Sequence, residues 1–369
     1  MSEEFAERLP RTSEIVAGDQ QAGQHKGIQL FVSLPGQTVA DIAVGEAAPD
    51  RPLTTETRMA WLSSGKPLTA LAIGRLVEAG RLAWEDTVAT HLPEFEGKGK
   101  EQVTIRHLLT HTGGIAANDS GYPEATWDES IRLIAESPLE EGWEVGESAA
   151  YQPSVSWFLL GEIIARVSGR SFSEFLDDEI LTPCGMPMTS FSIGEQQAGR
   201  LEEKLGWMWN RRGRELEPLD WHQFPRLGRK SPGSSARGPV RELATFYRQL
   251  LESLAGGPGA VFPSELVATM TRPHRVGKMD RTFRHTIDFG LGFLVNSNRY
   301  GPETVPYSFG RHASPRAFGH GGSQSSIAFA DPEHGLVVAW ATNAMIGEPR
   351  HQKRNLAINS AIYEDLGLA

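Results

Sequence analysis

Short apolar runs bounded by turn residues predict strands near both ends of the chain. Ile28 to Leu34 is typical of a strand, a Pro35-Gly36 turn follows, and Thr38 to Val44 completes a hairpin. The apolar stretch that ends at Ser63 is expected to join the same sheet. The last part of the chain returns to this pattern and predicts strands at Phe289 to Val295, Ser325 to Ala330 and Leu336 to Asn343.

Helical periodicity fills the middle of the chain and both termini. Apolar residues recur there every three or four positions, which is the spacing of one face of a helix. The pattern predicts helices over Ser2 to Gly23 (with a polar loop at its end), Leu68 to Ala79, Val103 to His111, Ser154 to Val167, Phe172 to Ile180, Pro239 to Leu254 and His351 to Leu368.

This order of elements predicts an α/β fold of the α+β kind. Strands from both chain ends form one antiparallel sheet flanked by helices, and a mostly helical domain is inserted between them. We expect residues 1–85 and 285–369 to form the sheet domain and residues 86–284 the inserted domain. An active site is expected in the cleft between the two parts.

The composition of the chain indicates which kinds of molecule the protein binds and where it is found. The 369 residues carry a net charge of −10, which argues against nucleic acid and anionic membranes. Cys184 is the only cysteine, so no internal disulfide can form. Met1 to Gln24 do not show the basic segment followed by an apolar segment that marks a secretory signal. No apolar run is long enough to span a membrane. We expect a cytoplasmic protein, unless a leader was trimmed from the sequence; its oligomeric state is left open.

The spacing of Ser63 and Lys66 carries the first candidate chemistry. Pro67 lacks an N–H and is tolerated only in the first turn of a helix, so the helix begins close to Ser63. The serine then lies at the positive end of the helix dipole, and Lys66 follows three residues later on the same face. A buried lysine loses proton affinity and serves as a base for the serine. The alternative is a serine that caps the helix, followed by a surface lysine.

Tyr151 stands between a glycine-containing loop and the apolar helix that begins near Ser154. Near a cationic Lys66 its phenol is expected to lose its proton more easily and to act as a general base. The alternative is a half-buried tyrosine that covers the end of a helix.

A glycine-rich stretch, His320-Gly321-Gly322-Ser323, precedes the strand at Ser325. Glycines at 321 and 322 allow the backbone to approach a ligand closely. The N–H groups of Ser63 and Ser323 are expected to form an oxyanion hole for a substrate carbonyl. The alternative is a simple strand entry with His320 at the surface.

His107 and His111 have the i, i+4 spacing of two metal ligands on one helix face. No nearby motif supplies a third ligand, so packing histidines are the favoured interpretation, and we expect neither a metal nor a cofactor. Residues 199–238 hold Trp207, Trp209 and Trp221, which either line a substrate cleft or pack. For the arginines at 211, 212 and 214 solvent exposure is favoured.

The three stretches follow one another as Ser63-Ser64-Gly65-Lys66, Tyr151-Gln152-Pro153 and His320-Gly321-Gly322. Together they resemble the three motifs of the serine β-lactamase-like superfamily, above all the class C β-lactamases and the related esterases and acyltransferases. Thr104 to Gly114, Trp157 to Ile164 and Phe318 to Asp331 also look like segments of that family. The resemblance spans about residues 25 to 345 and implies the fold of that superfamily.

The resemblance also implies roles. Ser63 would be the nucleophile that forms an acyl-enzyme, and Lys66 would accept or electrostatically favour removal of its proton. Tyr151 would pass the proton to the leaving group and later activate the incoming nucleophile. The N–H groups of Ser63 and Ser323 would hold the oxyanion. His320 occupies the position where β-lactamases and transpeptidases usually have lysine.

Two departures from the family pattern bear on the substrate. Pro153 stands where most class C enzymes have an asparagine, and it has no amide to hold a β-lactam or peptide side chain. His320 and Gly321 replace the lysine and threonine of Lys-Thr-Gly, so a cation and a hydroxyl are missing. Both changes weaken recognition of a carboxylate-bearing substrate such as a β-lactam.

These observations predict a serine hydrolase or acyltransferase that acts on an ester, thioester or amide of a small molecule. Its partners would be that acyl donor and water, an amine or an alcohol as acceptor. A β-lactamase or D-Ala-D-Ala carboxypeptidase is the second interpretation. A binding protein that kept the fold without turnover is the third, and the joint presence of Ser63, Lys66 and Tyr151 argues against it.

Overall fold

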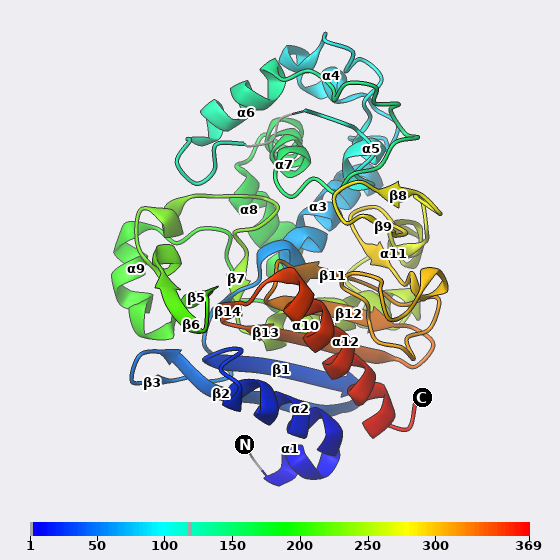
Figure 1. The fold of residues 1–369 in the computed structure, drawn as a ribbon. Coiled ribbons are helices and arrows are strands. Elements are labelled where there is room, and N and C mark those ends of the chain that lie inside the picture. Colours follow the sequence, from blue (N-terminus) through cyan, green and yellow to red (C-terminus); the bar gives the residue numbers. More distant parts are fainter. Residues whose placement is uncertain (1–2, 117–119) are drawn as a thin grey trace.

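A seven-stranded antiparallel sheet joins the two ends of the chain in the computed structural model, which describes residues 3–116 and 120–369 (Figure 1). Its strand order is β10-β11-β12-β13-β1-β2-β3. The strands are β1 (Gly27–Leu34), β2 (Gln37–Ala48), β3 (Arg51–Pro52), β10 (Leu294–Val295), β11 (Phe318–Gly322), β12 (Ser326–Asp331) and β13 (Leu336–Thr342). β1 pairs with β13 along its length, which confirms the predicted sheet built from both chain ends.

Helices cover both faces of this sheet, because strand side chains alternate between the faces. Trp340 of β13 packs in one layer with α1 (Glu3–Arg8), α2 (Pro10–Gln21) and α12 (Glu348–Asp365). Figure 1 shows α12 lying across this face of the sheet. Ala339 packs in the other layer, with α10 (Val240–Leu254). The N-terminal helix, expected as one segment from Ser2, is two helices; Ser2 itself lies outside the described residues. Pro10 opens the second helix, where a missing N–H costs nothing.

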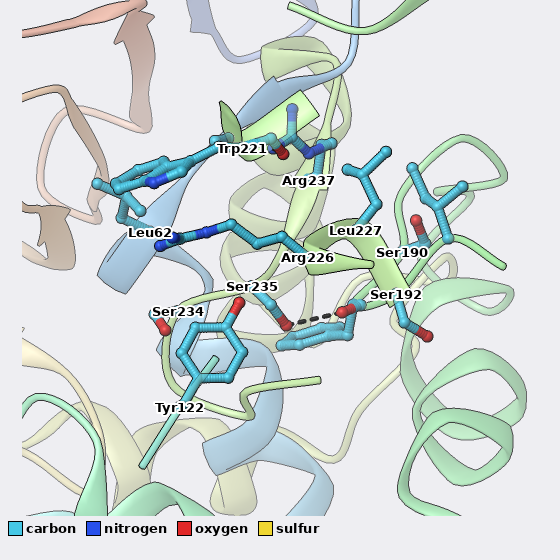
Figure 2. A pocket seen from close by; sticks show the side chains of 13 residues that line it. Leu62, Tyr122, Ser190, Ser192, Trp221, Arg226, Leu227, Ser234, Ser235 and Arg237 are labelled. Atoms are coloured by element: carbon cyan, nitrogen blue, oxygen red, sulfur yellow. Dashed lines mark hydrogen bonds between the residues drawn. The ribbon is translucent and has the colours of Figure 1, made fainter. Parts of the chain in front are cut away.

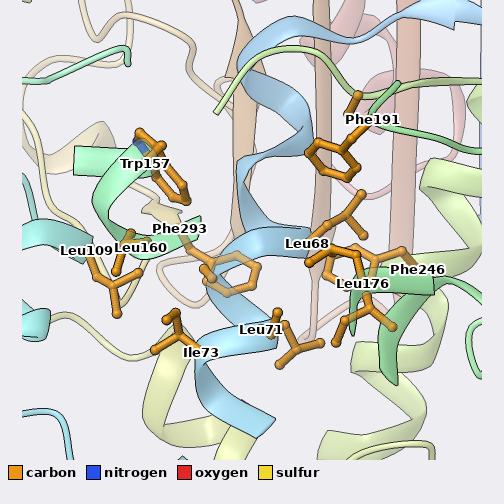
Figure 3. Close-up of a cluster of buried hydrophobic side chains, with 14 of the residues drawn as sticks. Leu68, Leu71, Ile73, Leu109, Trp157, Leu160, Leu176, Phe191, Phe246 and Phe293 are labelled. Atoms are coloured by element: carbon orange, nitrogen blue, oxygen red, sulfur yellow. The ribbon is translucent and has the colours of Figure 1, made fainter. Parts of the chain in front are cut away.

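α3 (Lys66–Glu78) runs through the hydrophobic core and packs against α7 (Val155–Ser168), α8 (Phe172–Leu176) and α11 (Ser264–Thr271). The other helices outside the sheet layers are α4 (Val88–His91), α5 (Ile105–Leu109), α6 (Trp127–Glu136) and α9 (Glu195–Leu201). Figure 3 shows Leu68, Leu71 and Ile73 of α3 among side chains from α5, α7, α8 and α10. Since α3 is enclosed on all sides, its N-terminal end is held rigidly against the sheet.

The strand before Ser63 was expected in the large sheet, and that prediction is wrong. β4 (Met59–Ala60) pairs instead with β7 (Arg237–Gly238) in a separate two-stranded sheet. The N–H of Trp61 donates to the carbonyl oxygen of Ala236 at 3.0 Å, which extends this pairing toward the serine. A segment from the middle of the chain therefore lies beside Ser63.

The strand expected over Phe289 to Val295 is also mostly wrong, because only Leu294–Val295 enters the sheet as β10. The chain turns at Gly292, whose φ is 81°, a conformation that favours glycine. A Cβ at this position would lie 2.3 Å from the Cβ of Ala70, so the turn packs directly on α3. Contact with the core decided against a continuous strand here.

Smaller elements complete the fold. β5 (Met208–Arg212), β6 (Glu215–Leu219) and β14 (Ala344–Met345) form a three-stranded sheet, and β8 (Met279–Asp280) pairs with β9 (His285–Thr286). The side chain of Thr104 caps α5, and the helix ends at Leu109 rather than at the expected His111. The division into two domains stays a prediction. In the described part of the chain, no helix combines the length and apolarity needed to span a membrane.

Candidate active site

Ser63 lies in a tight turn between β4 and α3. A 3₁₀ turn over Leu62–Gly65 leads directly into the helix, as the position of Pro67 predicted. Leu62 has a φ of 51°, a left-handed conformation that costs a leucine on the order of 1–3 kcal/mol. Ser63 is 8% exposed and stands at the N-terminal end of α3, where developing negative charge is favoured.

Lys66 is fully buried, and its Nζ lies 2.9 Å from the Oγ of Ser63. Nζ also lies 2.8 Å from the carbonyl oxygen of Pro153 and 2.7 Å from that of Gly233. Within residues 3–116 and 120–369 no carboxylate pairs with it, and burial lowers the pKa of Lys66 well below its ordinary value. A neutral amine has two N–H groups and one lone pair, which match two carbonyls and the serine hydroxyl. The surface-lysine alternative is wrong.

Tyr151 lies beside this pair, with its ring centroid 5.4 Å from the Nζ of Lys66. The expected loss of proton affinity is wrong: burial raises the pKa of Tyr151 well above its ordinary range, although a hydrogen bond with Ser63 acts in the opposite direction. The physical reason is that burial disfavours the charged phenolate, and the negative charges of Asp280 and Glu348 disfavour it further. Tyr151 is therefore a protonated phenol that can pass a proton along, and not a standing base.

The loop that carries Tyr151 is fixed by three buried side chains from other elements. Its N–H donates to Asp280 Oδ1 at 3.1 Å, and Asp280 pairs with the guanidinium of Arg275 at 3.0 Å. The N–H of Gln152 donates to His111 Nδ1 at 3.1 Å, and the rings of His111 and Tyr151 are 4.6 Å apart. The sequence interpretation missed Asp280 and Arg275, since no motif marks them.

His111 and His107 take separate structural roles. His107 Nδ1 accepts the N–H of Thr104 at the N-terminus of α5, whereas His111 supports the Tyr151 loop. Among the described residues no group of three or more His, Cys, Asp or Glu side chains is arranged to hold a metal ion. The favoured interpretation of packing histidines is confirmed, since His111 bears on the site through ring packing and one hydrogen bond.

His320 lies in the interior on β11, so the alternative that places it at the surface is wrong. Its Nδ1 lies 2.7 Å from the carbonyl oxygen of Gly321; a carbonyl only accepts, so Nδ1 carries the proton. Nε2 has no hydrogen-bond partner in the described part of the chain, and the ring is 5.9 Å from that of Tyr151. Burial lowers the pKa of His320 to about 3, so the imidazole is neutral at pH 7.

Glycines allow β11 to lie close to the turn over Leu62–Gly65 that carries Ser63, which is called the nucleophile turn below. A Cβ at Gly322 would lie 2.2 Å from the carbonyl oxygen of Trp61, and one at Gly321 would lie 2.1 Å from the ring of Tyr307. Ser64 fixes the approach, because its hydroxyl donates to the carbonyl oxygen of His320 at 3.1 Å. Ser323 follows directly after the strand, with its side chain exposed.

The segment 199–238, unassigned from the sequence, contributes a wall of this site. Trp221 lines a cavity next to Leu62, whereas Trp207 stacks on His222 with ring centroids 4.0 Å apart. Trp209 is buried in a small cluster of its own. Of the three tryptophans, one therefore belongs to a cleft and two pack, while the arginines at 212 and 214 are exposed and the one at 211 is half-buried.

Known proteins share both this sequence and this fold. The model of the Beta-lactamase family matches residues 12–362. A candidate D-alanyl-D-alanine carboxypeptidase of Escherichia coli K12 is 25% identical over 303 residues, which cover 74% of this chain and 66% of the relative. Esterase EstB of Burkholderia gladioli is 30% identical over 167 residues, which cover 40% of this chain and 42% of the esterase.

A solved structure agrees in fold over almost the entire length. EstCE1, described as a hydrolase with promiscuous acyltransferase activity, matches with a TM-score of 0.81 at 21% identity, over 98% of this chain and 100% of that one. The family match covers nearly the whole chain, and the large antiparallel sheet flanked by helices is the fold that the resemblance implied. The protein belongs to the Beta-lactamase family of serine hydrolases.

Proposed function

We propose that the protein transfers an acyl group from a small ester to water or to another acceptor through an acyl-enzyme on Ser63. The observation that carries this proposal is the 2.9 Å separation between Lys66 Nζ and Ser63 Oγ in a buried site. Burial lowers the pKa of Lys66, so the amine is free to accept the hydroxyl proton.

The proposed reaction follows from these positions. Ser63 Oγ gives its proton to Lys66 Nζ and bonds to the acyl carbon, and the N–H groups of Ser63 and Ser323 hold the oxyanion. When the bond to the leaving oxygen breaks, the proton passes from Lys66 through the hydroxyl of Tyr151 to that oxygen. The oxygen or nitrogen of water, an alcohol or an amine acceptor then bonds to the acyl carbon and gives its proton through Tyr151 to Lys66, and Lys66 returns a proton to Ser63 Oγ as the acyl–Oγ bond breaks.

The substrate class is argued from what surrounds these groups. The neutral His320 and the missing side chain at Gly321 provide neither a cation nor a hydroxyl for a β-lactam carboxylate. An activated ester needs only the nucleophile, the base and the oxyanion donors. Esterase EstB and EstCE1, which are similar to this chain, support an ester or acyl-transfer substrate. A small-molecule partner fits the acidic net charge of −10, and the cytoplasmic location stays a prediction.

A β-lactamase or D-Ala-D-Ala carboxypeptidase is the second candidate. The similarity to the candidate carboxypeptidase of Escherichia coli favours it. Pro153, His320 and Gly321 argue against it, because each loses a contact that a β-lactam or peptide substrate uses. Losing two charged hydrogen bonds of about 1.5–3 kcal/mol each should lower kcat/KM by roughly two to four orders of magnitude.

The test compares a p-nitrophenyl acyl ester with a chromogenic cephalosporin on one preparation. We expect the ester to be cleaved with a kcat/KM at least about 100-fold above that of the cephalosporin. Ser63→Ala should abolish ester cleavage. The matched control Ser64→Ala, which removes a structural hydroxyl, should keep measurable turnover. A cephalosporin value equal to or above the ester value would favour the second candidate, and full activity in Ser63→Ala would exclude the proposed nucleophile.

A further inference from the structure

A cavity of about 140 Å³ lies directly beside the nucleophile turn (Figure 2). Leu62, which precedes Ser63, forms one wall of it. Ser234 forms another and follows Gly233, the residue whose carbonyl oxygen lies 2.7 Å from Lys66 Nζ. The cavity is therefore lined by the sequence neighbours of Ser63 and Gly233, while Ser63 and Lys66 themselves are not among the described residues that line it.

Tyr151 and His320 do not belong to the described residues that line this cavity. In the proposed reaction the leaving oxygen must lie at the hydroxyl of Tyr151, because that hydroxyl supplies its proton. The cavity beside Leu62 is thus left for the other part of the ester, the acyl chain. Its volume suits a short chain, since pockets for drug-sized ligands hold about 300–1,000 Å³.

The charge of this cavity is one-sided. Among the described residues that line the cavity, Arg226 and Arg237 carry positive charge, and none of the lining residues is an aspartate or a glutamate. Arg226 lies over the ring of Trp221 at 4.7 Å, and its guanidinium points toward Leu62 in Figure 2. Its contact with Asp220 is stretched to 4.0 Å, and that carboxylate is 71% exposed. Arg226 is thus a cation with little of its charge compensated.

Arg237 is buried and holds its position through backbone carbonyls. It donates to the carbonyl oxygens of Gly206 at 3.1 Å and Trp221 at 3.0 Å. Burial, together with the charge of Arg226, lowers the pKa of Arg237 to about 10, so the group stays protonated at neutral pH. Two like charges therefore share a partly desolvated cavity in a chain whose net charge is −10, and an anion would relieve their repulsion.

Hydroxyl groups add neutral donors to the same cavity. Figure 2 shows the hydroxyl of Tyr122 directed toward Ser235. The Oγ of Ser190 is buried and has no hydrogen-bond partner within residues 3–116 and 120–369. Guanidinium and hydroxyl donors around a small space are the groups that bind a carboxylate.

We propose that this cavity binds a carboxylate at the far end of the acyl chain, so that the preferred acyl donor is a half-ester of a short dicarboxylic acid. The inference rests on the proposed acyl transfer at Ser63 and specifies its substrate. It is compatible with weak β-lactam recognition, because the positive charge lies beside Leu62 and not on β11. The cation that the family places near the Gly-Gly strand is absent there, and two others stand in the acyl cavity.

The test uses two p-nitrophenyl esters of equal chain length, the hexanoate and the half-ester of adipic acid, with spontaneous hydrolysis subtracted. We expect the wild-type kcat/KM for the adipate half-ester to exceed that for the hexanoate by about tenfold or more. Arg226→Gln should lower this adipate-to-hexanoate ratio by about 10–100-fold. The matched control Arg248→Gln, on the exposed side of α10, should leave the ratio unchanged.

Two results would refute the carboxylate-binding cavity, and a third would refute the proposed acyl transfer itself. Hexanoate cleavage that depends on Ser63, with an adipate-to-hexanoate ratio at or below one, would refute the carboxylate cavity and leave the proposed acyl transfer standing. A ratio that Arg226→Gln does not change would also refute it. Cleavage of neither ester by the wild-type protein would instead refute the proposed function itself.

Discussion

Two buried basic residues, Arg275 and Lys66, flank the loop of Tyr151, and their partners differ. Arg275 is 1% exposed and pairs with the carboxylate of Asp280 at 3.0 Å, while its guanidinium also donates to the carbonyl oxygens of Thr110 and Ile287. Lys66 is equally buried, but its Nζ meets a hydroxyl and two carbonyls. Arg275 is thus charge-compensated, whereas Lys66 has no compensating carboxylate in the described part of the chain.

This difference separates a basic residue that stabilises the structure from one that can take part in proton transfer. Burial lowers the pKa of Arg275, but the charge of Asp280 opposes that shift, and an arginine stays protonated in any case. Burial lowers the pKa of Lys66 without such opposition. One cation therefore holds the Tyr151 loop in place, and the other can exchange a proton with Ser63.

The largest expected effect is on catalysis by Lys66. Lys66→Met removes the proposed base and should lower kcat/KM for a p-nitrophenyl ester by about 10³-fold or more, with an unchanged circular dichroism spectrum. Lys100 offers a matched control, because it is also buried, lies 4.2 Å over the ring of Phe95, and has no contact with the site. Lys100→Met should keep most of the activity. If Lys66→Met retained more than a tenth of it, Lys66 would be structural like Arg275.

Substitution of Arg275 should mainly lower the stability of the fold, whereas substitution of Lys66 mainly lowers activity. Arg275→Met leaves Asp280 buried and unpaired, which is expected to cost about 3–5 kcal/mol of unfolding free energy, measured by urea denaturation. The double variant Arg275→Met/Asp280→Asn removes the orphaned charge and should recover part of that loss. A single variant as stable as the wild type would show that the buried pair does not hold the loop.

Tyr151 connects the two regions, and its hydroxyl can be removed without disturbing its ring. Tyr151→Phe should lower kcat by about 100-fold while the melting temperature changes by no more than a few degrees, since the contacts with His111 and Phe283 remain. A loss of kcat smaller than about fivefold would mean that Tyr151 only packs between the two cations.

The smallest expected effect is a pH dependence of stability. The folded protein keeps Lys66 neutral below the ordinary lysine pKa of about 10.4, whereas the unfolded chain binds the proton. Since the unfolded state then binds more protons, stability rises with pH between the lowered pKa of Lys66 and about pH 10.4. Lys66→Met should thus be more stable than the wild type at pH 7, and this gain should shrink toward pH 10. A gain independent of pH would indicate a charged Lys66.

Much of this arrangement could be predicted from the sequence because it depends on residues that are close together along the chain. The turn before α3, the cap at Thr104 and the end of α7 at Gly169 depend on residues a few positions apart. The sheet from both chain ends follows from apolar runs of the right length. The Ser63 to Lys66 spacing fixes their proximity, since both belong to one turn.

The parts that sequence could not predict depend on distant contacts. β4 pairs with β7 from a segment more than a hundred residues away, and no local signal selects that partner. The Arg275–Asp280 pair and the Arg226 side of the acyl cavity come from loops whose course is set by packing. The raised pKa of Tyr151 could not be predicted either, because it depends on how deeply the loop is buried.

The most direct test of the central claim is to trap the acyl group on the enzyme. We would mix the protein with excess p-nitrophenyl hexanoate, quench in acid within the first turnover, and map the adduct by peptide mass spectrometry. The account predicts a mass increase of one hexanoyl group on the peptide that contains Ser63, absent in Ser63→Ala. Turnover without any adduct at Ser63, or an adduct on another residue that persists in Ser63→Ala, would contradict it. An unlabelled and inactive wild-type protein would support a binding protein instead.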